Sequence, residues 1–392
     1  MVTVNGTDKS GGPLAGVKII ELSGIGPAPL CCSLLSDMGA DILRIDRNAP
    51  SGLGSPRTTR TDLLRRGRPS VAIDMKHPDG IATVLKLVDQ ADAIIDPFRP
   101  GVTERLGLGP AECLARNPKL VYGRMTGWGQ DGTLNQAAGH DLNYIALTGV
   151  LHAIGPKELP TPPLNVVGDM GGGAMFLAVG ILAAVIEARQ SGHGQVVDTA
   201  MTEGAAYLAT GAFGSLAAGD WVHERTSNIL DGGAHFYRCY KTSDAKFVSI
   251  ASIEAKFYAI LLEKLGLQAS DLPSQMDRST WPAMAKKFEA LFAEKTRDQW
   301  CEIMEGSDIC FAPVLTFDEA FEHPHAKTRG SFVVVDGVKQ PVPAPRFSRT
   351  PIGIKSAPPE LGANTAAGLA SWGMSEDEID NLIESKAIGW QG

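Results

Sequence analysis

The amino-acid sequence predicts an α/β protein with a large parallel-sheet domain and a smaller α+β domain. In the N-terminal third, short β-branched runs alternate with helical patterns, which is typical of βαβ units and a mostly parallel sheet. From residue 236 the pattern changes to a strand followed by charged helices. The 392 residues, 44% of them hydrophobic, suffice for two domains with cores of their own.

The predicted strands of the large domain follow one another closely, each separated from the next by turn or helix signals. They cover residues 17–22, 41–45, 71–74, 93–95 and 120–122. A helix is predicted between the first two strands, from Leu30 to Met38, with Gly39 as its terminator. The resulting sheet is Rossmann-like, so we expect ligands beyond the carboxyl ends of its strands.

The second half of the chain begins with a loop-rich, Pro-rich stretch over residues 134–163. A long helix is predicted from Asp169 to Arg189 and a second one from Asp198 to Ala218. The apolar run within the first, Ala174 to Ile186, is shorter than the about 20 residues that a membrane span needs, so it predicts a buried helix. Later elements are expected at residues 246–251 (strand), 255–265, 280–295 and 297–305 (helices), and 332–347 (strand-like).

These patterns predict five segments. They are a disordered leader (1–13), a large domain (14–200), a connector (201–235), a small domain (236–330) and a C-terminal segment that returns to the large domain (331–392).

Charge and cysteine content exclude several classes of protein. The formal net charge of −8 argues against binding to nucleic acid or to an anionic membrane. The six cysteines are scattered and form no C-x-x-C pair, which indicates a reducing, cytoplasmic setting and no disulfide framework. The histidines show no metal-ligand spacing, so we expect neither a metal nor a redox cofactor.

Two features near the early strands suggest anionic ligands. Gly24, Gly26 and Asp46 fit part of a dinucleotide fingerprint, but Pro29 stands where its third glycine belongs, which disfavours a nicotinamide site. Basic residues also cluster there, and together they predict a site for a phosphorylated ligand, although each alone is more typical of a solvated surface. They are Arg44, Arg47, Arg57, Arg60, Arg65, Arg66, Arg68 and Lys76.

A histidine and an aspartate are each set among glycines. His140 follows Gly139 in a loop, where Asp141 and Asn143 are expected to fix the imidazole or the loop itself. Asp169 precedes three glycines at the start of an apolar helix, a costly arrangement that suggests a close approach to the backbone, with helix N-capping as the alternative. A base and an acid on opposite faces of one carbon are what racemisation of a carbon acid requires.

Motifs in the same order along the chain give it a family resemblance. They occupy residues 17–27, 37–47, 98–102, 125–130, 139–144, 163–169, 194–198 and 231–234. With these residues the chain resembles the α-methylacyl-CoA racemases of the family III CoA-transferase superfamily. The resemblance runs from about Leu14 through Gly266 and implies a CoA-binding large domain in an interlocked homodimer.

The resemblance also implies roles for individual residues. His140 and Asp169 would be the catalytic acid/base pair, and Glu254 would support the histidine. The residues implied to contact coenzyme A, itself part of the substrate, are Arg47, Ala72, Ile73, Asp74, Met75, Arg99, Gly139, Asp141, Leu142, Asn143 and Tyr144.

The expected reaction interconverts the epimers of 2-methylacyl-CoA thioesters through an enolate, whose oxygen would be held by N–H groups at the start of the Asp169 helix. The main alternative is a CoA-transferase, in which Asp169 would act as a nucleophile and form an acyl-enzyme. His140 and Glu254 favour the racemase, because transferases of this superfamily typically lack that histidine and carry a glycine run near the place of Glu254. A CoA-binding protein without catalysis is the third possibility.

Overall fold

The computed structural model describes residues 11–49 and 58–389. The chain divides into two compact units. Unit 1 comprises the described residues up to 148, together with 164–208 and those from 329 on, and unit 2 comprises 149–163 and 209–328. The predicted leader lies outside the described residues except for residues 11–13, and so does Arg57.

Unit 1 is built on a parallel sheet, which confirms the predicted α/β class. The strands are β1 (Lys18–Leu22), β2 (Asp41–Asp46), β3 (Ser70–Ala72), β4 (Ala93–Asp96), β5 (Val121–Thr126) and β6 (Val196–Ala200). Among the described residues they form one six-stranded sheet in the order β3-β2-β1-β4-β5-β6. This strand order reverses between β1 and β4, and ligands of doubly wound sheets bind beyond the strand ends at such a point.

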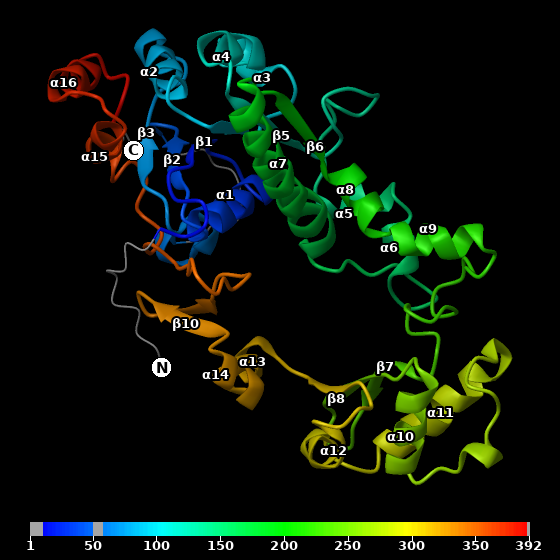
Figure 1. Cartoon of the computed structure of the whole chain (residues 1–392). Coiled ribbons are helices and arrows are strands. Elements are labelled where there is room, and N and C mark those ends of the chain that lie inside the picture. Colours follow the sequence, from blue (N-terminus) through cyan, green and yellow to red (C-terminus); the bar gives the residue numbers. More distant parts are fainter. Residues whose placement is uncertain (1–10, 50–57, 390–392) are drawn as a thin grey trace. The chain divides into compact units, whose positions relative to one another are not determined.

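Helices cover both faces of this sheet (Figure 1). On one face lie α1 (Pro27–Asp37) and α7 (Phe176–Ser191), which share an apolar core with the strands. On the other face lie α2 (Pro78–Val88), α4 (Pro110–Arg116), α15 (Thr365–Ser371) and α16 (Glu376–Glu384). Shorter helices of unit 1 are α3 (Val102–Arg105), α5 (Asp141–Ala146) and α8 (Met201–Leu208), and a hairpin consists of β10 (Phe332–Val335) and β11 (Val338–Pro341).

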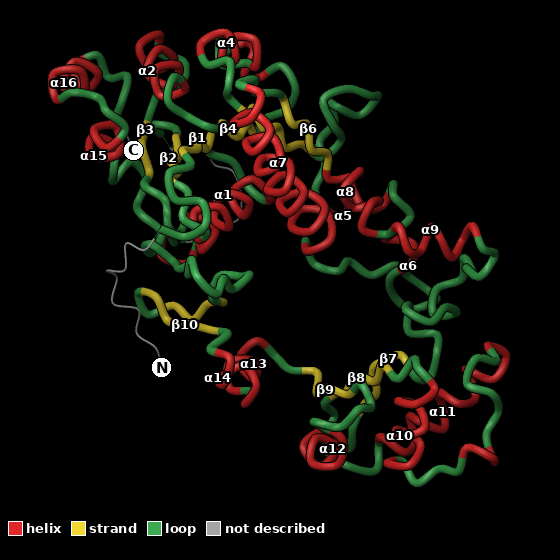
Figure 2. The backbone as a smooth tube through the Cα atoms, in the orientation of Figure 1, coloured by secondary structure: helices red, strands yellow, loops and turns green. Residues whose placement is uncertain are grey.

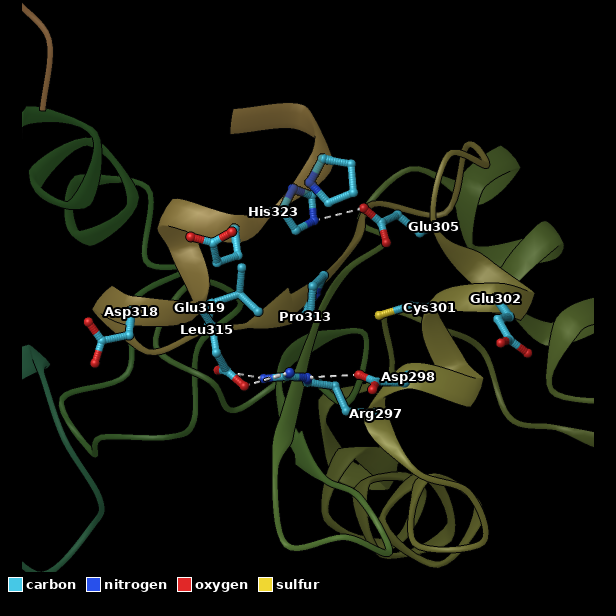
Figure 3. A pocket seen from close by; sticks show the side chains of 12 residues that line it. Arg297, Asp298, Cys301, Glu302, Glu305, Pro313, Leu315, Asp318, Glu319 and His323 are labelled. Atoms are coloured by element: carbon cyan, nitrogen blue, oxygen red, sulfur yellow. Dashed lines mark hydrogen bonds and ion pairs between the residues drawn. The ribbon is translucent and has the colours of Figure 1, made fainter. Parts of the chain in front are cut away.

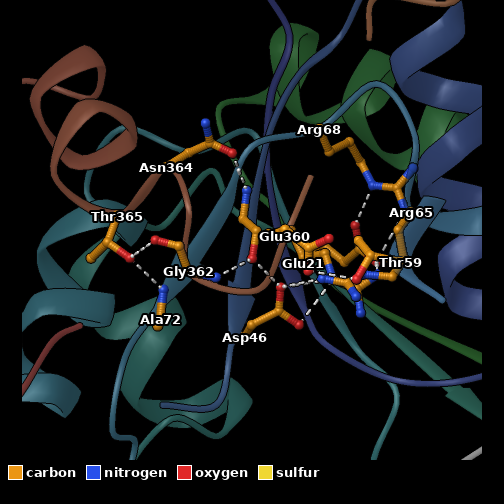
Figure 4. Close-up of polar contacts among 12 residues, drawn as sticks. Glu21, Asp46, Thr59, Arg65, Arg68, Ala72, Glu360, Gly362, Asn364 and Thr365 are labelled. Carbon is orange, nitrogen blue, oxygen red and sulfur yellow. Dashed lines mark hydrogen bonds and ion pairs between the residues drawn. The ribbon is translucent and has the colours of Figure 1, made fainter. Parts of the chain in front are cut away.

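The C-terminal segment covers the edge strand β3. The Ser70 N–H donates to Asn364 Oδ1 at 3.1 Å, and the Ala72 N–H donates to Thr365 Oγ1 at 3.0 Å (Figure 4). Trp372, only 1% exposed, fills the core between this segment and the sheet. An edge strand with unpaired backbone groups can pair with another chain and aggregate. The C-terminal segment therefore protects this edge, and it also completes the core.

The sixth strand corrects the prediction of a single helix from Asp198 to Ala218. Residues 196–200 pair with β5 in parallel, and the helical part begins only at Met201, as α8 followed by α9 (Thr210–Ala217). Pairing with β5 determines the strand conformation of residues 196–200, because strand formation depends more on the neighbouring strand than on local propensity.

The long helix starts earlier than predicted and changes type along its length. It begins as the π-helical segment η3 (Val166–Met175) and continues as α7, which packs on Gly123 of β5 through Leu177 and Ile181. Over Val166–Ser191 the helix is long and apolar enough to span a membrane by length and composition. A core helix passes the same test, and this one buries its sheet-facing side while Val179 and Ile186 stay exposed.

Unit 2 contains the predicted smaller α+β part, together with residues 149–163 and 209–235, which the sequence assigned to the large domain and the connector (Figure 2). Its antiparallel sheet consists of β7 (Tyr237–Lys241), β8 (Phe247–Ala251) and β9 (Phe311–Val314), in that order. Its helices are α6 (Val150–Ala153), α9, α10 (Ala255–Lys264), α11 (Trp281–Phe292), α12 (Arg297–Met304), α13 (Phe317–Glu322) and α14 (Pro324–Arg329). Aromatic side chains dominate its core, with Tyr240 stacked on Phe292 at 4.9 Å between ring centroids.

Candidate active site

His140 lies at the N-cap of α5, at the end of the loop that follows β5. Its N–H donates to Asn143 Oδ1 at 3.1 Å, so Asn143 fixes the backbone of the loop, one of the two roles that the sequence suggested for it. The imidazole is exposed and available to a substrate.

The loop before His140 is held by two aromatic side chains. The Tyr144 hydroxyl donates a short hydrogen bond to the Gly139 carbonyl oxygen. The Tyr144 ring packs edge-on against Trp128 at 4.8 Å and lies where a Cβ on Gly127 or Gly139 would stand. These glycines are therefore required for packing. Trp128 entered the sequence analysis only as part of a family motif, because a tryptophan between glycines carries no signal of its own about a neighbouring loop.

Asp169 lies in the first turns of η3 and is not its N-cap. Its carboxylate Oδ2 accepts a hydrogen bond from Asn165 Nδ2 at 3.1 Å, while its own N–H donates to Asp141 Oδ2 at 2.6 Å. The Asp141 carboxylate therefore binds Asp169 and not the imidazole, the partner that the sequence suggested. The Asp169 N–H is already paired, so it is excluded from the N–H groups predicted to hold an enolate oxygen.

His140 and Asp169 lie on elements that pack together, α5 and η3. Burial raises the pKa of the Asp169 carboxyl above its usual range, and the hydrogen bond from Asn165 opposes this effect. The charge of Asp141 raises this pKa further, and the charge of His140 lowers it. A carboxyl with a raised pKa holds its proton more strongly, which suits a proton donor at neutral pH.

The glycines after Asp169 are explained by a neighbouring helix. A Cβ on Gly172 would lie 2.6 Å from the Ala205 nitrogen, and one on Gly204 would lie 1.9 Å from the Gly172 oxygen. The close approach that the sequence suggested does occur here, and α8 makes it. Gly26, before α1, also faces the site, since a Cβ there would lie 3.4 Å from Asp169 Oδ2.

The residues implied to contact coenzyme A differ in how far they are exposed to solvent. Arg47, Arg99, Leu142 and Asn143 are exposed, Asp74 and Gly139 are half-buried, and Ala72, Ile73, Met75, Asp141 and Tyr144 are buried. Arg47 follows β2, the segment 72–75 starts at the last residue of β3, and Arg99 follows β4, so all three lie at the carboxyl end of the sheet.

Arg99 belongs to the surroundings of the acid/base pair. Burial raises the pKa of Tyr144, the charge of Asp169 raises it further, and the charge of Arg99 lowers it. Arg99 also donates to the Gln136 carbonyl oxygen at 3.3 Å. A positive charge from the β4 loop therefore acts on the same tyrosine that supports the histidine loop.

Glu254 belongs to unit 2, where it is the exposed N-cap of α10. Within that unit its charge raises the pKa of Cys310, in addition to the effect of burial. Its implied support of His140 remains a prediction.

The predicted anion site at the basic cluster is wrong for most of its members, because carboxylates inside the protein already pair with them (Figure 4). Arg68 is fully buried, and its Nε donates to Glu21 at 2.6 Å. Arg44 pairs with Glu21 and with Asp46, which also pairs with Arg65. Asp46, the residue of the partial dinucleotide fingerprint, is buried in the same network.

Of the remaining basic residues that the structure describes, two also pair with carboxylates. Arg66 pairs with Asp37 at 2.9 Å and Arg60 with Asp336 at 3.4 Å. Arg47 and Lys76 stay exposed. The positions of the basic residues in the sequence do not show their acidic partners, because these partners come from other strands and from the C-terminal segment.

Two cavities lie outside the predicted site. One of about 620 Å³ in unit 2 is lined by ion pairs, Arg297 with Glu319 at 2.8 Å and His323 with Glu305 at 3.0 Å (Figure 3). A second of about 360 Å³ in unit 1 is lined in part by Trp128. In residues 11–49 and 58–389, no three histidine, cysteine, aspartate or glutamate side chains converge as metal ligands.

The fold and the residues of this site define a class of protein. The family model for CoA-transferase family III matches residues 14–365, and the chain belongs to this family.

Individual relatives make the assignment more specific. The chain is 45% identical to the alpha-methylacyl-CoA racemase of Mus musculus and 41% identical to that of Homo sapiens, in both cases over 96% of this chain and 98% of the relative. It is 29% identical to the succinyl-CoA--D-citramalate CoA-transferase of Chloroflexus aurantiacus, over 96% of this chain and 98% of that protein.

Solved structures share the fold. A CAIB/BAIF family protein from Brucella suis superimposes with a TM-score of 0.79 at 23% identity, over 92% of this chain and 100% of that chain. The Mycobacterium tuberculosis protein Rv3272 gives a TM-score of 0.75 at 22% identity, over 91% of this chain and 99% of that chain.

Proposed function

We propose that this protein is a racemase that interconverts (2R)- and (2S)-2-methylacyl-CoA thioesters. The observation that carries the proposal is the pair His140 and Asp169 on packed neighbouring elements, with the pKa of Asp169 raised toward that of a proton donor. The names and high identities of the mouse and human relatives support the same reaction.

The proposed chemistry is a proton exchange at one carbon. Neutral His140 takes the α-proton from one face of the thioester, and the electron pair of the C–H bond moves into an enolate. Protonated Asp169 then gives its proton to the opposite face, which leaves imidazolium and carboxylate, and solvent restores both groups. In the reverse direction the two residues exchange roles.

Backbone donors would stabilise the enolate oxygen, since a preorganised N–H group costs no reorganisation as charge develops. The Asp169 N–H is committed to Asp141, so this role falls to other N–H groups at the start of the helix. The CoA part would bind at the strand ends through Arg47, Arg99, the segment 72–75 and the 139–144 loop.

The CoA-transferase alternative uses Asp169 as an anionic nucleophile. Several CoA-transferases are relatives, but at 28–29% identity, compared with 41–45% for the racemases. The raised pKa of Asp169 and the neighbouring imidazole also support the racemase, because a carboxyl that keeps its proton attacks a thioester poorly.

We also propose a homodimer in which Glu254 supports the histidine. Large apolar side chains exposed on α7 and α8, among them Val179 (66% exposed) and Leu208 (54% exposed), support an interface. All six cysteines are free thiols, which supports a reducing compartment such as the cytoplasm.

The proposal is tested by incubating one epimer of a 2-methylacyl-CoA in D2O. Wild type is expected to give both epimers with deuterium at the α-carbon. His140→Ala and Asp169→Ala are each expected to lose about 100-fold or more of this exchange, because each removes one proton-transfer group.

His193→Ala serves as the control, since His193 is exposed at the end of α7, outside the proposed site. Full exchange in both site variants would contradict the proposal. Transfer of CoA to a free carboxylate in place of exchange would establish the transferase.

A further inference from the structure

The carboxylate of Asp141 makes a contact within the protein that differs from the contact with coenzyme A implied by the family resemblance. We propose that Asp141 is a positioning residue for Asp169, fixing its backbone and placing a second negative charge beside its carboxyl group. This inference rests on the racemase function proposed above.

The geometry identifies a built contact. Asp141 Oδ2 accepts the Asp169 N–H at 2.6 Å, and Asp141 is only 5% exposed although it lies in the first turn of a surface helix. Gly168 makes this approach possible, because a Cβ at that position would lie 2.7 Å from Asp141 Oδ2. A hydrogen bond from a backbone N–H to a carboxylate is charge-assisted and therefore among the stronger ones.

The contact joins the two catalytic groups. His140, the proposed base, is the N-cap residue of α5, and Asp141 follows it directly. The start of α5 therefore carries the base and also the residue that holds Asp169, the proposed acid. Any displacement of Asp141 changes the separation of the imidazole and the carboxyl group. A misplacement of about 1 Å at such a site costs about 100-fold in rate.

The charges around Asp169 come from few elements. On the α5 side, Asp141 raises the pKa of Asp169 and His140 lowers it. Of the other packed elements, β6 carries Asp198, which accepts the Gln130 N–H, and α8 carries Glu203, which lines the cavity at Trp128. Asp141 is therefore the carboxylate whose charge acts on Asp169, besides the larger effect of burial.

This second charge bears on the choice of reaction. A protonated Asp169 can return a proton to an enolate, whereas a nucleophile must be ionised. By raising the proton affinity of Asp169, Asp141 favours the protonated form that returns a proton to the enolate and makes the carboxylate a stronger base for the reverse direction. The same effect lowers the population of the anionic nucleophile that acyl transfer needs, on a fold whose relatives include both chemistries.

The test uses Asp141→Asn in the full-length enzyme. The side-chain amide keeps an oxygen that can accept the Asp169 N–H, but it removes the charge. The pH dependence of kcat is measured for each epimer as starting substrate, with α-deuterium exchange as a second readout. We expect the limb that belongs to Asp169 to move to lower pH, because without Asp141 the carboxyl loses its proton more easily.

Asp141→Ala removes both the acceptor and the charge, so kcat is expected to fall about 100-fold. Asp131→Asn is the matched control, since Asp131 is an exposed carboxylate in the loop before His140, and its pH profile should equal that of wild type. Thermal unfolding of each variant is measured in parallel, and Asp141→Ser replaces Asp141→Asn if the latter does not fold.

An unchanged pH profile in folded Asp141→Asn, or in folded Asp141→Ser in its place, would overturn this inference. The proposed function fails in a different way, through the absence of α-exchange in the wild type.

Discussion

His235 lies in the core of unit 2, where only 1% of its surface is exposed. Its Nε2 is 2.8 Å from the Tyr258 hydroxyl, and its ring packs edge-on against Phe236 and Phe288. Burial, with a smaller contribution from the charge of Arg238, lowers the pKa of His235 to about 4. The imidazole is therefore neutral in the folded protein over the whole physiological range.

This histidine makes unit 2 acid-sensitive. Between pH 6.5 and about 4 the unfolded chain binds a proton at His235 and the folded chain does not, so the free energy of unfolding falls as the pH falls. The loss is on the order of 3 kcal/mol over that interval. Denaturant unfolding at several pH values measures it.

His235→Gln keeps a polar group near Tyr258 but does not titrate, so its stability should depend less on pH in this interval than that of wild type. His193→Gln, at an exposed histidine, should retain the slope of wild type. Equal slopes in the wild type and His235→Gln would show that other groups cause the acid sensitivity.

The two proposed catalytic residues depend on neighbours that are close in sequence but have different roles. Asp141 and Asn143 were both expected to fix the imidazole or its loop. In the structure Asn143 holds the His140 N–H and Asp141 holds the Asp169 N–H. The sequence shows that polar side chains are present at these positions. Which partner each one binds depends on how η3 packs against α5 in the folded protein.

At the scale of elements, the π-helical start of the long helix places the proposed acid. The segment η3 packs against α1, α5 and α8, and its glycines allow α8 to approach its backbone closely. In the proposed mechanism this close packing contributes to the position of Asp169, because Asp169 belongs to η3.

Gly204→Ala tests this packing. The new Cβ would lie 1.9 Å from the Gly172 oxygen, so η3 and α8 must separate. We expect a loss of stability of about 1–3 kcal/mol or more, accompanied by a loss of activity, because Asp169 moves with η3. Urea denaturation and the deuterium-exchange assay measure the two effects.

Gly211→Ala in α9 is the matched control. Apart from its chain neighbours and the backbone of its own helix, nothing lies within 4 Å of its added Cβ, and alanine is a better helix former than glycine by up to about 1 kcal/mol. Its stability should equal or exceed that of wild type. A stable, fully active Gly204→Ala protein would refute the account of these glycines.

At the scale of the whole molecule, the proposed homodimer predicts how mass and stability depend on concentration. Sedimentation is expected to give twice the mass of the chain. Because association stabilises only the folded state, the unfolding midpoint should rise with protein concentration. A monomer at all concentrations, with a constant midpoint, would reject the proposed dimer.

Much of this protein followed from its sequence. Alternating β-branched and helical runs predicted the parallel sheet, which the structure confirms. The glycine-flanked His140 and Asp169 predicted an acid/base pair, and this role stays a prediction, although the two residues belong to neighbouring elements, α5 and η3. The physical reason is that strand and helix periodicity, turns and glycines are local signals, which depend on residues a few positions apart.

Only the tertiary structure decided the partners that come from distant parts of the chain. It paired the basic cluster with Glu21, Asp46 and Asp37, placed α8 against the glycines of η3, and laid Trp372 of the C-terminal segment on the sheet. These contacts join residues far apart in the sequence, and their energies arise from burial and charge pairing that exist only after the elements have packed.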